Sequence, residues 1–177
     1  MLVVTGPSGV GKGTLIKALC REFPDLRLAV SATTRGPRSG EKEGVDYHFL
    51  SHEDFDRRVA DGEFLEHATY AGNRYGTLRS EVENDPVVLE IEVQGARQVR
   101  GALPEAMQVF IAPPSTEVLR ARLIARGPDS PEVIRKRLEV AEEELAAQHE
   151  FPHVIVNDDL QRAVQELADL VATMWRP

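Results

Sequence analysis

A glycine-rich segment near the amino terminus combines the residue types needed to hold phosphate groups. It reads Gly6-Pro7-Ser8-Gly9-Val10-Gly11-Lys12-Gly13-Thr14 and follows the apolar run Leu2–Thr5. Glycines at these spacings admit backbone angles closed to other residues, so that main-chain N–H groups can converge on an anion. Lys12 adds a mobile positive charge for the outer phosphates. The segment therefore predicts a nucleotide-phosphate site, with an ordinary glycine-rich turn as the alternative.

The residue after the lysine departs from the usual form of such loops. Gly13 stands where a serine or threonine hydroxyl normally coordinates Mg²⁺, and Thr14 comes one position later. Mg²⁺ gives up its bound water reluctantly. We therefore expect no direct protein ligand for Mg²⁺. The nucleotide and water would hold it, with the carboxylate of Glu90 nearby.

A second cationic cluster follows the next apolar run. Arg35 and Arg38 lie three residues apart on a loop stiffened by Pro37. Two guanidinium groups at this spacing can converge on one phosphate. Tyr47 and Tyr75, later in the same polar segment, offer hydroxyl donors. A solvated surface is the alternative for each arginine alone, but the end of a strand is where α/β sheets bind ligands.

Acidic residues interrupt the apolar run that begins at Val87. Glu90 and Glu92 are two positions apart, which puts them on one side of a predicted strand over 87–93. Buried carboxylates are costly unless they are paired or hydrogen-bonded. Salt bridges to arginines, Mg²⁺ coordination through water (better for Glu90) and hydrogen bonds to a ligand (better for Glu92) all remain open. Glu66 is a third candidate.

Three further arginines flank a turn rich in glycine and proline. Arg122 and Arg126 are four residues apart and share a helix face, and Arg137 follows the turn. A solvated helix face would explain any one of them. Together they suggest a lid that closes over phosphoryl oxygens.

Elements that could position these groups alternate along the chain. Strands are predicted at 2–5, 26–32, 87–93, 107–112 and 154–156, and helices at 15–23, 53–60, 133–145 and 160–174. Continuous apolar strands between helices indicate a parallel sheet covered on both faces. We predict an α/β fold resembling P-loop NTPases, divided into a core (1–32, 87–121 and 139–177), an inserted mixed α/β subdomain (33–86) and a helical lid (122–138).

Composition narrows the class of protein. The chain has 177 residues, a formal net charge of −8 and one cysteine, Cys20. The negative charge argues against a nucleic-acid partner. No apolar run approaches the length of a membrane span, no secretory signal is visible, and a single cysteine fits a reducing compartment. We expect a cytoplasmic enzyme with no membrane or nucleic-acid partner, while the sequence leaves the choice between monomer and homo-oligomer open.

The glycine-rich segment and the cluster of Arg35 and Arg38 form two predicted phosphate-binding sites, and two such sites imply two phosphorylated substrates. Phosphoryl transfer from a nucleoside triphosphate to an acceptor that already bears a phosphate would use both sites. A phosphate oxygen needs no strong general base as a nucleophile, so catalysis would rest on positioning and charge stabilisation.

Several motifs resemble those of guanylate kinases in order and spacing, over essentially the whole chain. They are Gly6–Lys12, Ser31–Arg38, Asp46-Tyr47-His48-Phe49, Tyr75-Gly76-Thr77, Leu89–Gly95 and Val156–Leu160. The resemblance implies conversion of GMP, and of dGMP, to GDP or dGDP with ATP and Mg²⁺, in purine nucleotide metabolism. Glu90 and Glu92 depart from the family, many of whose members have aspartates there.

The resemblance also implies roles for individual residues. GMP would be bound by Ser31, Arg35, Arg38, Tyr47, Glu66, Tyr75, Thr77 and Glu92. ATP would be bound by Gly6, Pro7, Ser8, Gly9, Val10, Gly11, Lys12, Gly13 and Thr14, with Asn157 near the adenine. The catalytic groups would be Lys12, Arg38, Arg122, Arg126 and Arg137.

The two carboxylates expected to bind the base, Glu66 and Glu92, fit guanine chemically. Guanine presents N–H donors at N1 and N2, which carboxylates at Glu66 and Glu92 can accept, whereas adenine presents an acceptor at N1. Such a site rejects the wrong base strongly. Two alternatives remain: a kinase for another phosphorylated acceptor, such as a sugar phosphate, and a non-catalytic domain that binds phosphopeptides. Intact Lys12 and lid arginines argue against the second.

Overall fold

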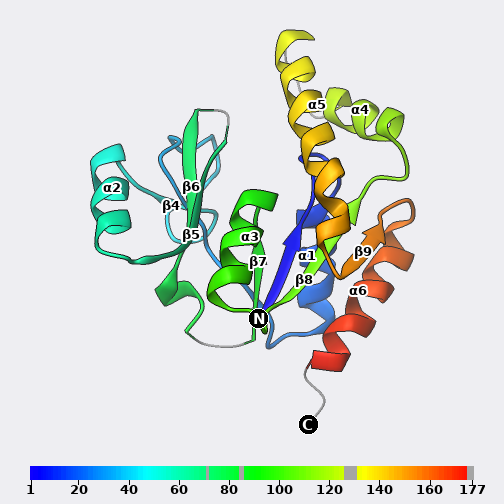
Figure 1. Cartoon of the computed structure of the whole chain (residues 1–177), viewed down its shortest axis with the longest axis horizontal. Helices are drawn as coiled ribbons and strands as arrows, with labels where there is room; N and C mark the ends of the chain where they lie inside the picture. Colours follow the sequence, from blue (N-terminus) through cyan, green and yellow to red (C-terminus); the bar gives the residue numbers. More distant parts are fainter. Residues whose placement is uncertain (71, 84–85, 126–130, 175–177) are drawn as a thin grey trace.

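A five-stranded parallel sheet forms the centre of the larger part of the molecule (Figure 1). The computed structural model describes residues 1–70, 72–83, 86–125 and 131–174. The strands lie in the order β2 (Arg27–Leu28), β7 (Val87–Glu90), β1 (Leu2–Thr5), β8 (Met107–Ala112) and β9 (His153–Val156). Every neighbouring pair is parallel, with Val3 opposite Leu89 and Gln108. The predicted parallel sheet is confirmed.

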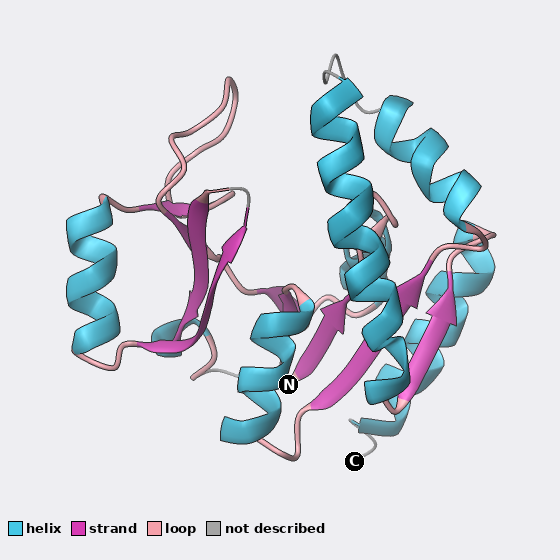
Figure 2. Cartoon of the chain, turned by 45° about the horizontal axis from the view of Figure 1, so that its top comes forward, coloured by secondary structure: helices cyan, strands magenta, loops and turns pink. Residues whose placement is uncertain are grey.

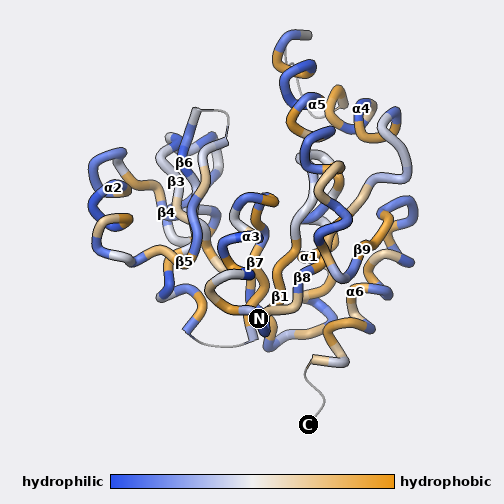
Figure 3. Tube along the Cα trace, in the orientation of Figure 1, coloured by the Kyte–Doolittle hydropathy of each residue, from blue (hydrophilic) through white to orange (hydrophobic). Residues whose placement is uncertain are grey.

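Helices cover both faces of this sheet. On one face, α1 (Lys12–Glu22) and α6 (Leu160–Met174) pack on Leu2 and Val4. On the other face, α3 (Val93–Ala102) packs on Val3. Alternate residues of β1 thus enter opposite hydrophobic clusters, as a strand buried on both sides requires. Figure 3 shows the apolar residues concentrated on these central strands.

A smaller, mixed sheet stands beside the core (Figure 2). Its strands are β4 (His48–Phe49), β3 (Ala32–Thr33), β6 (Asn73–Leu78) and β5 (Phe64–Tyr70), and only β3 and β4 run parallel. Helix α2 (His52–Ala60) covers it, with Phe55 stacked on Phe64 at 4.4 Å between ring centroids. The Ser51 side chain caps α2 by accepting from the Asp54 amide.

Edge strand β5 connects the smaller sheet to the core through α3. The side-chain amide of Gln98 on α3 pairs with the backbone of His67, accepting from its N–H at 3.1 Å and donating to its C=O at 2.7 Å. Leu65 of β5 enters the same hydrophobic cluster as α3. This packing holds β5 against the core helix that begins just after Glu92.

Two helices stand on the other side, facing the smaller sheet (Figure 1). They are α4 (Thr116–Ala125) and α5 (Pro131–Ala146), and a short helix, η2 (Ala147–Glu150), leads from α5 to β9. Another short helix, η1 (Arg79–Glu81), leads from the smaller sheet back to β7. Within the described residues, no helix is long and apolar enough to span a membrane.

Two predicted strands were too long. The run predicted at 26–32 divides into β2 and β3, which belong to different sheets, because the chain leaves the core after Ala29 donates to Val88. The run predicted at 87–93 ends at Glu90, and Glu92 is the N-cap residue of α3. Glu90 and Glu92 therefore do not share a strand face. The division into core, subdomain and lid stays a prediction.

Candidate functional site

One large cavity lies between the two sheets and the base of α5. Its volume is about 1010 Å³. Segments far apart in the sequence contribute its polar wall. The predicted site residues that line it are Ser8, Gly9, Gly11, Lys12, Gly13, Thr14, Ser31, Arg35, Arg38, Tyr47, Glu66, Tyr75, Glu90, Glu92, Arg122 and Arg137. The structure thus brings most of the predicted residues to one site.

The glycine-rich loop connects β1 to α1 in a conformation that requires glycine. Gly6 and Gly11 have φ of 139° and 103°, outside the range of other residues. A Cβ on Gly6 would lie 2.3 Å from the Ile111 carbonyl oxygen. Helix α1 begins at Lys12, so its amino-terminal dipole faces the cavity. Lys12 Nζ donates to Gly6 O at 2.5 Å and to Pro7 O at 3.3 Å. The lysine is therefore poised over an anion-binding loop.

The back of this loop is fixed by two side chains that share one acceptor. Asn157 Nδ2 donates to Val10 O at 2.8 Å, and Arg122 Nη1 donates to the same oxygen at 3.2 Å. Arg122 Nη2 also donates to Asn157 O at 2.9 Å. Asn157 is buried and is not among the residues that line the cavity. Its contacts in this structure hold the loop, and its expected place near adenine stays a prediction.

Gly13 lies against Glu90, which explains why this position carries no side chain. A Cβ on Gly13 would meet Glu90 Oε2 at 3.3 Å. A side chain at position 13 would therefore crowd the carboxylate at the end of β7, which would have to shift by a few tenths of an ångström. No group of three or more metal-ligating side chains occurs in the ranges that the structure describes. One carboxylate beside the loop suits Mg²⁺ that keeps its water, and the way in which Mg²⁺ is held stays a prediction.

The two arginines of the smaller part meet at a carboxylate that the sequence analysis missed. Arg35 binds Glu41 with two hydrogen bonds, Nη2 to Oε1 at 2.9 Å and Nη1 to Oε2 at 3.0 Å. The Arg38 amide donates to Glu41 Oε2 at 2.7 Å. These contacts, led by the one from Arg35, lower the pKa of Glu41. Glu41 thus takes up the two parallel hydrogen bonds through which the Arg35 guanidinium could bind a phosphate, and phosphate binding at this loop stays a prediction.

The aromatic wall beside Arg35 consists of two tyrosines. The ring centroids of Tyr47 and Tyr75 are 6.1 Å apart, and the Arg35 guanidinium lies 5.3 Å from the Tyr47 ring centroid. Burial raises the pKa of Tyr47, so its hydroxyl stays protonated and can donate to a bound anion. Arg38 and both tyrosines line the same wall as Arg35.

Two further carboxyl groups line the cavity, one buried and one half-buried. Glu66 on β5 is 4% exposed, and Thr77 Oγ1 on the neighbouring strand donates to its Oε1 at 2.7 Å. Burial is the main cause that raises the pKa of Glu66 to about 7, against the opposing effect of Thr77. Burial also raises the pKa of Glu92, although the charge of Lys12 opposes this. Both groups suit a ligand that offers N–H donors.

A third acid, which is buried, was not predicted. Glu144 on α5 lines the cavity, and burial raises its pKa to about 7, while Lys12 opposes this and Glu92 adds to it. The backbone N–H groups of Ser8 and Val93 act against burial and lower this pKa. Glu144 is the last of three consecutive glutamates, and the sequence does not show which of them is buried. In the structure Glu142 and Glu143 are exposed and only Glu144 is buried.

The remaining predicted residues are not at the cavity wall or lie outside the described ranges. Thr77 is buried behind Glu66, and Val10 lies in the core. Gly6 and Pro7 shape the loop from behind, and their carbonyls accept from Lys12. Arg126 is outside the described residues.

Comparison with known proteins identifies relatives of this chain. The model of the guanylate kinase family matches residues 1–174. A guanylate kinase of Synechococcus sp. (strain CC9311) is 55% identical over 170 residues, which cover 93% of this chain and 90% of the relative. A guanylate kinase of Thermobifida fusca (strain YX) is 51% identical over 177 residues, covering 97% of this chain and 90% of the relative.

Solved structures agree with the fold. The crystal structure of guanylate kinase from Anaplasma phagocytophilum matches with a TM-score of 0.81 and 32% identity, covering 100% of this chain and 86% of that one. Shikimate kinase from Bacteroides thetaiotaomicron matches with a TM-score of 0.58 at 18% identity, covering 96% of each chain. The second likeness concerns the fold alone.

Proposed function

The chain belongs to the guanylate kinase family of enzymes, and on this premise we propose that it transfers a phosphoryl group from ATP to GMP. The products would be ADP and GDP. The observation that carries the proposal is the single cavity, which combines an anion-binding loop with buried carboxyl groups 50 or more residues away in sequence. Both substrates could therefore be held with their phosphates facing each other.

The acceptor would bind in the smaller part. Arg35, Arg38, Tyr47 and Tyr75 line a wall that suits its phosphate. Glu66 and Glu92 would accept from N1–H and the N2 amine of guanine, with Thr77 holding Glu66 in place. Ser31, at the same wall, would add a hydroxyl contact. These residues address the base and the phosphate rather than the sugar, so we propose dGMP as a second acceptor.

The donor would bind at the glycine-rich loop. Backbone N–H groups and the α1 amino terminus would hold the ATP phosphates, and Lys12 would swing from the carbonyls of Gly6 and Pro7 to the outer phosphates. Arg122 and Arg137, with Arg126, would offset charge on the group in transfer. Mg²⁺, carried by ATP, would supply further charge neutralisation, with Glu90 as the nearest carboxylate to its water.

Transfer then needs no protein base. An acceptor phosphate oxygen of GMP attacks the γ-phosphorus of ATP, the bond from that phosphorus to the β–γ bridging oxygen breaks, and the electron pair leaves with ADP. The protein contributes alignment, exclusion of water and positive charge, as in other phosphoryl transfers. This pathway belongs to purine nucleotide metabolism.

A panel of acceptors tests this proposal directly. ADP formation is measured with GMP, dGMP, AMP, dTMP and ribose 5-phosphate in parallel coupled assays, with ATP and Mg²⁺ present. We expect the highest kcat/KM with GMP, followed by dGMP. Activity with the sugar phosphate alone would replace the proposal by a sugar-phosphate kinase. Binding of ligands without any turnover would instead favour a non-catalytic binding domain.

A further inference from the structure

Two chain segments carry the backbone between the core sheet and the smaller sheet. The first runs from β2 to β3 through residues 29–31, and the second runs from β6 to β7 through η1. The first is very short. Ala29 N still donates to Val88 O of the core sheet at 2.9 Å, whereas Ser31 O already accepts from His48 N of the smaller sheet at 2.9 Å. Val30 is therefore the residue at which the backbone changes sheets.

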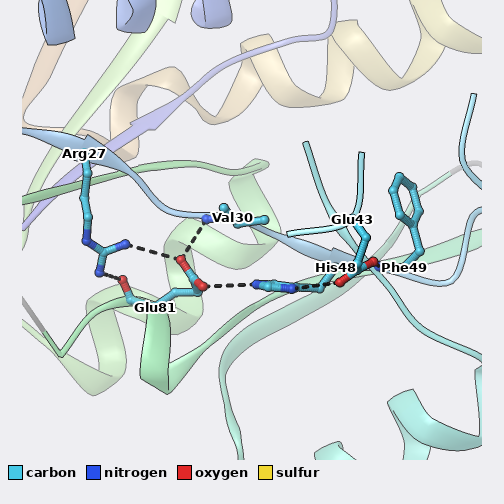
Figure 4. A network of polar contacts seen from close by, with 6 residues as sticks. All are labelled: Arg27, Val30, Glu43, His48, Phe49 and Glu81. Atoms are coloured by element: carbon cyan, nitrogen blue, oxygen red, sulfur yellow. Dashed lines mark hydrogen bonds and ion pairs between the residues drawn. The ribbon is translucent and has the colours of Figure 1, made fainter. Parts of the chain in front are cut away.

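The amide of Val30 is bound by a side chain from the second segment. Val30 N donates to Glu81 Oε2 at 3.0 Å (Figure 4). Glu81 is the last residue of η1. One carboxylate thus joins the two connecting segments at the position where the first of them leaves the core.

The same carboxylate reaches both sheets. Arg27 on β2 donates from Nη1 to Glu81 Oε2 at 3.3 Å and from Nη2 to the Glu81 carbonyl oxygen. His48 on β4 places Nε2 3.1 Å from Glu81 Oε1. The other ring nitrogen of His48, Nδ1, lies 3.2 Å from Glu43 Oε1, and Glu43 Oε2 accepts from Phe49 N at 2.8 Å. Figure 4 shows these residues in one row.

Burial and charge make this network stronger than an ordinary surface ion pair. The Glu81 side chain is 18% exposed, against 39% for Arg27 and 26% for His48. Burial disfavours the charged form of Glu81, but the Val30 amide, His48 and Arg27 outweigh it and hold its pKa below the ordinary value. An ionised carboxylate with three different donors is fixed in direction, since each partner restricts a different oxygen or lone pair.

We propose that Glu81 is a positioning residue: its carboxylate fastens the two connecting segments together and so fixes the orientation of the smaller sheet relative to the glycine-rich loop. No atom of Arg27, His48 or Glu81 lines the cavity, but Leu28, Ala29 and Ser31, which flank Val30, all do. A change at the Val30 amide therefore moves the acceptor wall. The consequence for turnover rests on the proposed function, whereas the orientation itself does not.

Distance measurement between spin labels tests the orientation without any substrate. Labels are attached at Glu53→Cys on α2 and Gln161→Cys on α6, both exposed positions, in a Cys20→Ser background. We expect the distance distribution to be narrow in this parent and clearly broader, or shifted, with Glu81→Gln. Glu83→Gln is the matched control, since it makes the same change at an exposed carboxylate two residues away. His48→Gln removes one contact and should broaden the distribution less.

Kinetics supply the second measurement. Glu81→Gln should raise the KM for GMP about fivefold and leave the KM for ATP unchanged, while Glu83→Gln changes neither. Unchanged distance distributions in both Glu81→Gln and His48→Gln would overturn the proposal, whatever the kinetics show. If Glu81→Gln does not fold, His48→Gln alone decides. Altered distances in an enzyme with no preference for GMP would uphold the positioning role and reject the proposed acceptor.

Discussion

The two halves of the cavity offer different groups to an anion. On the core side, the glycine-rich loop and the α1 amino terminus present main-chain groups, with Lys12 as the added charge. On the smaller side, arginine, tyrosine and glutamate side chains from separate strands and loops form the wall. A backbone site recognises phosphate and little else, whereas a side-chain site can also recognise a base. On the proposed function, we therefore expect selectivity for the base to come from the smaller sheet.

The largest effect is expected at the core half. Lys12→Met removes the charge that faces the transferred group and keeps the length of the side chain. We expect kcat/KM to fall by about 10²–10³-fold, the usual cost of losing one preorganised donor. Steady-state kinetics measure this, and an unchanged circular dichroism spectrum shows that the fold persists. Arg21→Met is the control, since it removes a positive charge from an exposed position of α1 that does not line the cavity, and an equal loss there would show a general effect of charge.

The second-largest effect is expected on the side of the cavity that is proposed to bind the base, at Glu66. A Cβ on Gly95 would lie 2.3 Å from Glu66 Oε2, so Gly95→Ala must displace this carboxylate. We expect GMP affinity, measured by calorimetry, to fall about ten- to a hundredfold, with ATP affinity unchanged. Gly101→Ala on the same helix meets nothing within 4 Å and should leave both affinities as they are. Equal losses for GMP in the two variants would show that Glu66 does not contact the acceptor.

Binding of GMP should also depend on pH through Glu66. Its pKa of about 7 means that it mostly carries a proton at pH 6, whereas the ionised form accepts more strongly from the N–H groups of guanine. Affinity should therefore rise about tenfold between pH 6 and pH 8 and level off above. The phosphate of GMP titrates in the same range, so the ratio of the affinities of parent and Glu66→Gln is the quantity to follow. A ratio that is constant with pH would contradict the assignment.

The same shift has a consequence for stability. Because the folded chain holds a proton on Glu66 that the unfolded chain has lost above the ordinary pKa of 4.5, the free energy of unfolding should fall as pH rises through 7. Glu66→Gln should reduce this slope. Denaturant unfolding at pH 6 and pH 8 measures it.

The smallest effect is expected on stability, from the hydrogen bonds that hold the glycine-rich loop at Val10. Asn157→Ala removes the bond to Val10 O, but Arg122 Nη1 still donates to that oxygen. The carbonyl is not left unpaired, so we expect the free energy of unfolding to fall by only about 1 kcal/mol. Thermal or denaturant unfolding measures this. A combined Asn157→Ala, Arg122→Ala variant should lose clearly more than the sum of the single changes.

The sequence predicted the core half better than the smaller half for a physical reason. A glycine-rich loop between a strand and a helix is local, so its residues and its spacing are visible in nine consecutive positions. Strands β1 and β8 were predicted with their observed ends because both faces of each are buried and their residues are mostly apolar. Local patterns suffice where the structure is local.

The smaller half depends on contacts between distant residues. Nothing in the run 26–32 marks Val30 as the point where the backbone changes sheets, because Leu28, Ala29 and Val30 are apolar residues that suit a continuous strand. Glu41 and Glu144 were missed because each lies among other charged residues, and only tertiary packing turns one toward Arg35 and the other toward Lys12. Glu92 was found, but on a strand rather than at the start of α3.

The central claim is that the core side of the cavity binds ATP and the smaller side binds GMP. One experiment that measures both ligands on a variant of each side tests it most directly. Calorimetry measures the affinities of GMP and of ATP, each alone, for Arg38→Ala and for Lys12→Met. The account predicts that Arg38→Ala weakens GMP by about tenfold or more and leaves ATP unchanged, whereas Lys12→Met weakens ATP and leaves GMP unchanged. Equal losses of both ligands in both variants would contradict it, because the cavity would then be one undivided anion site.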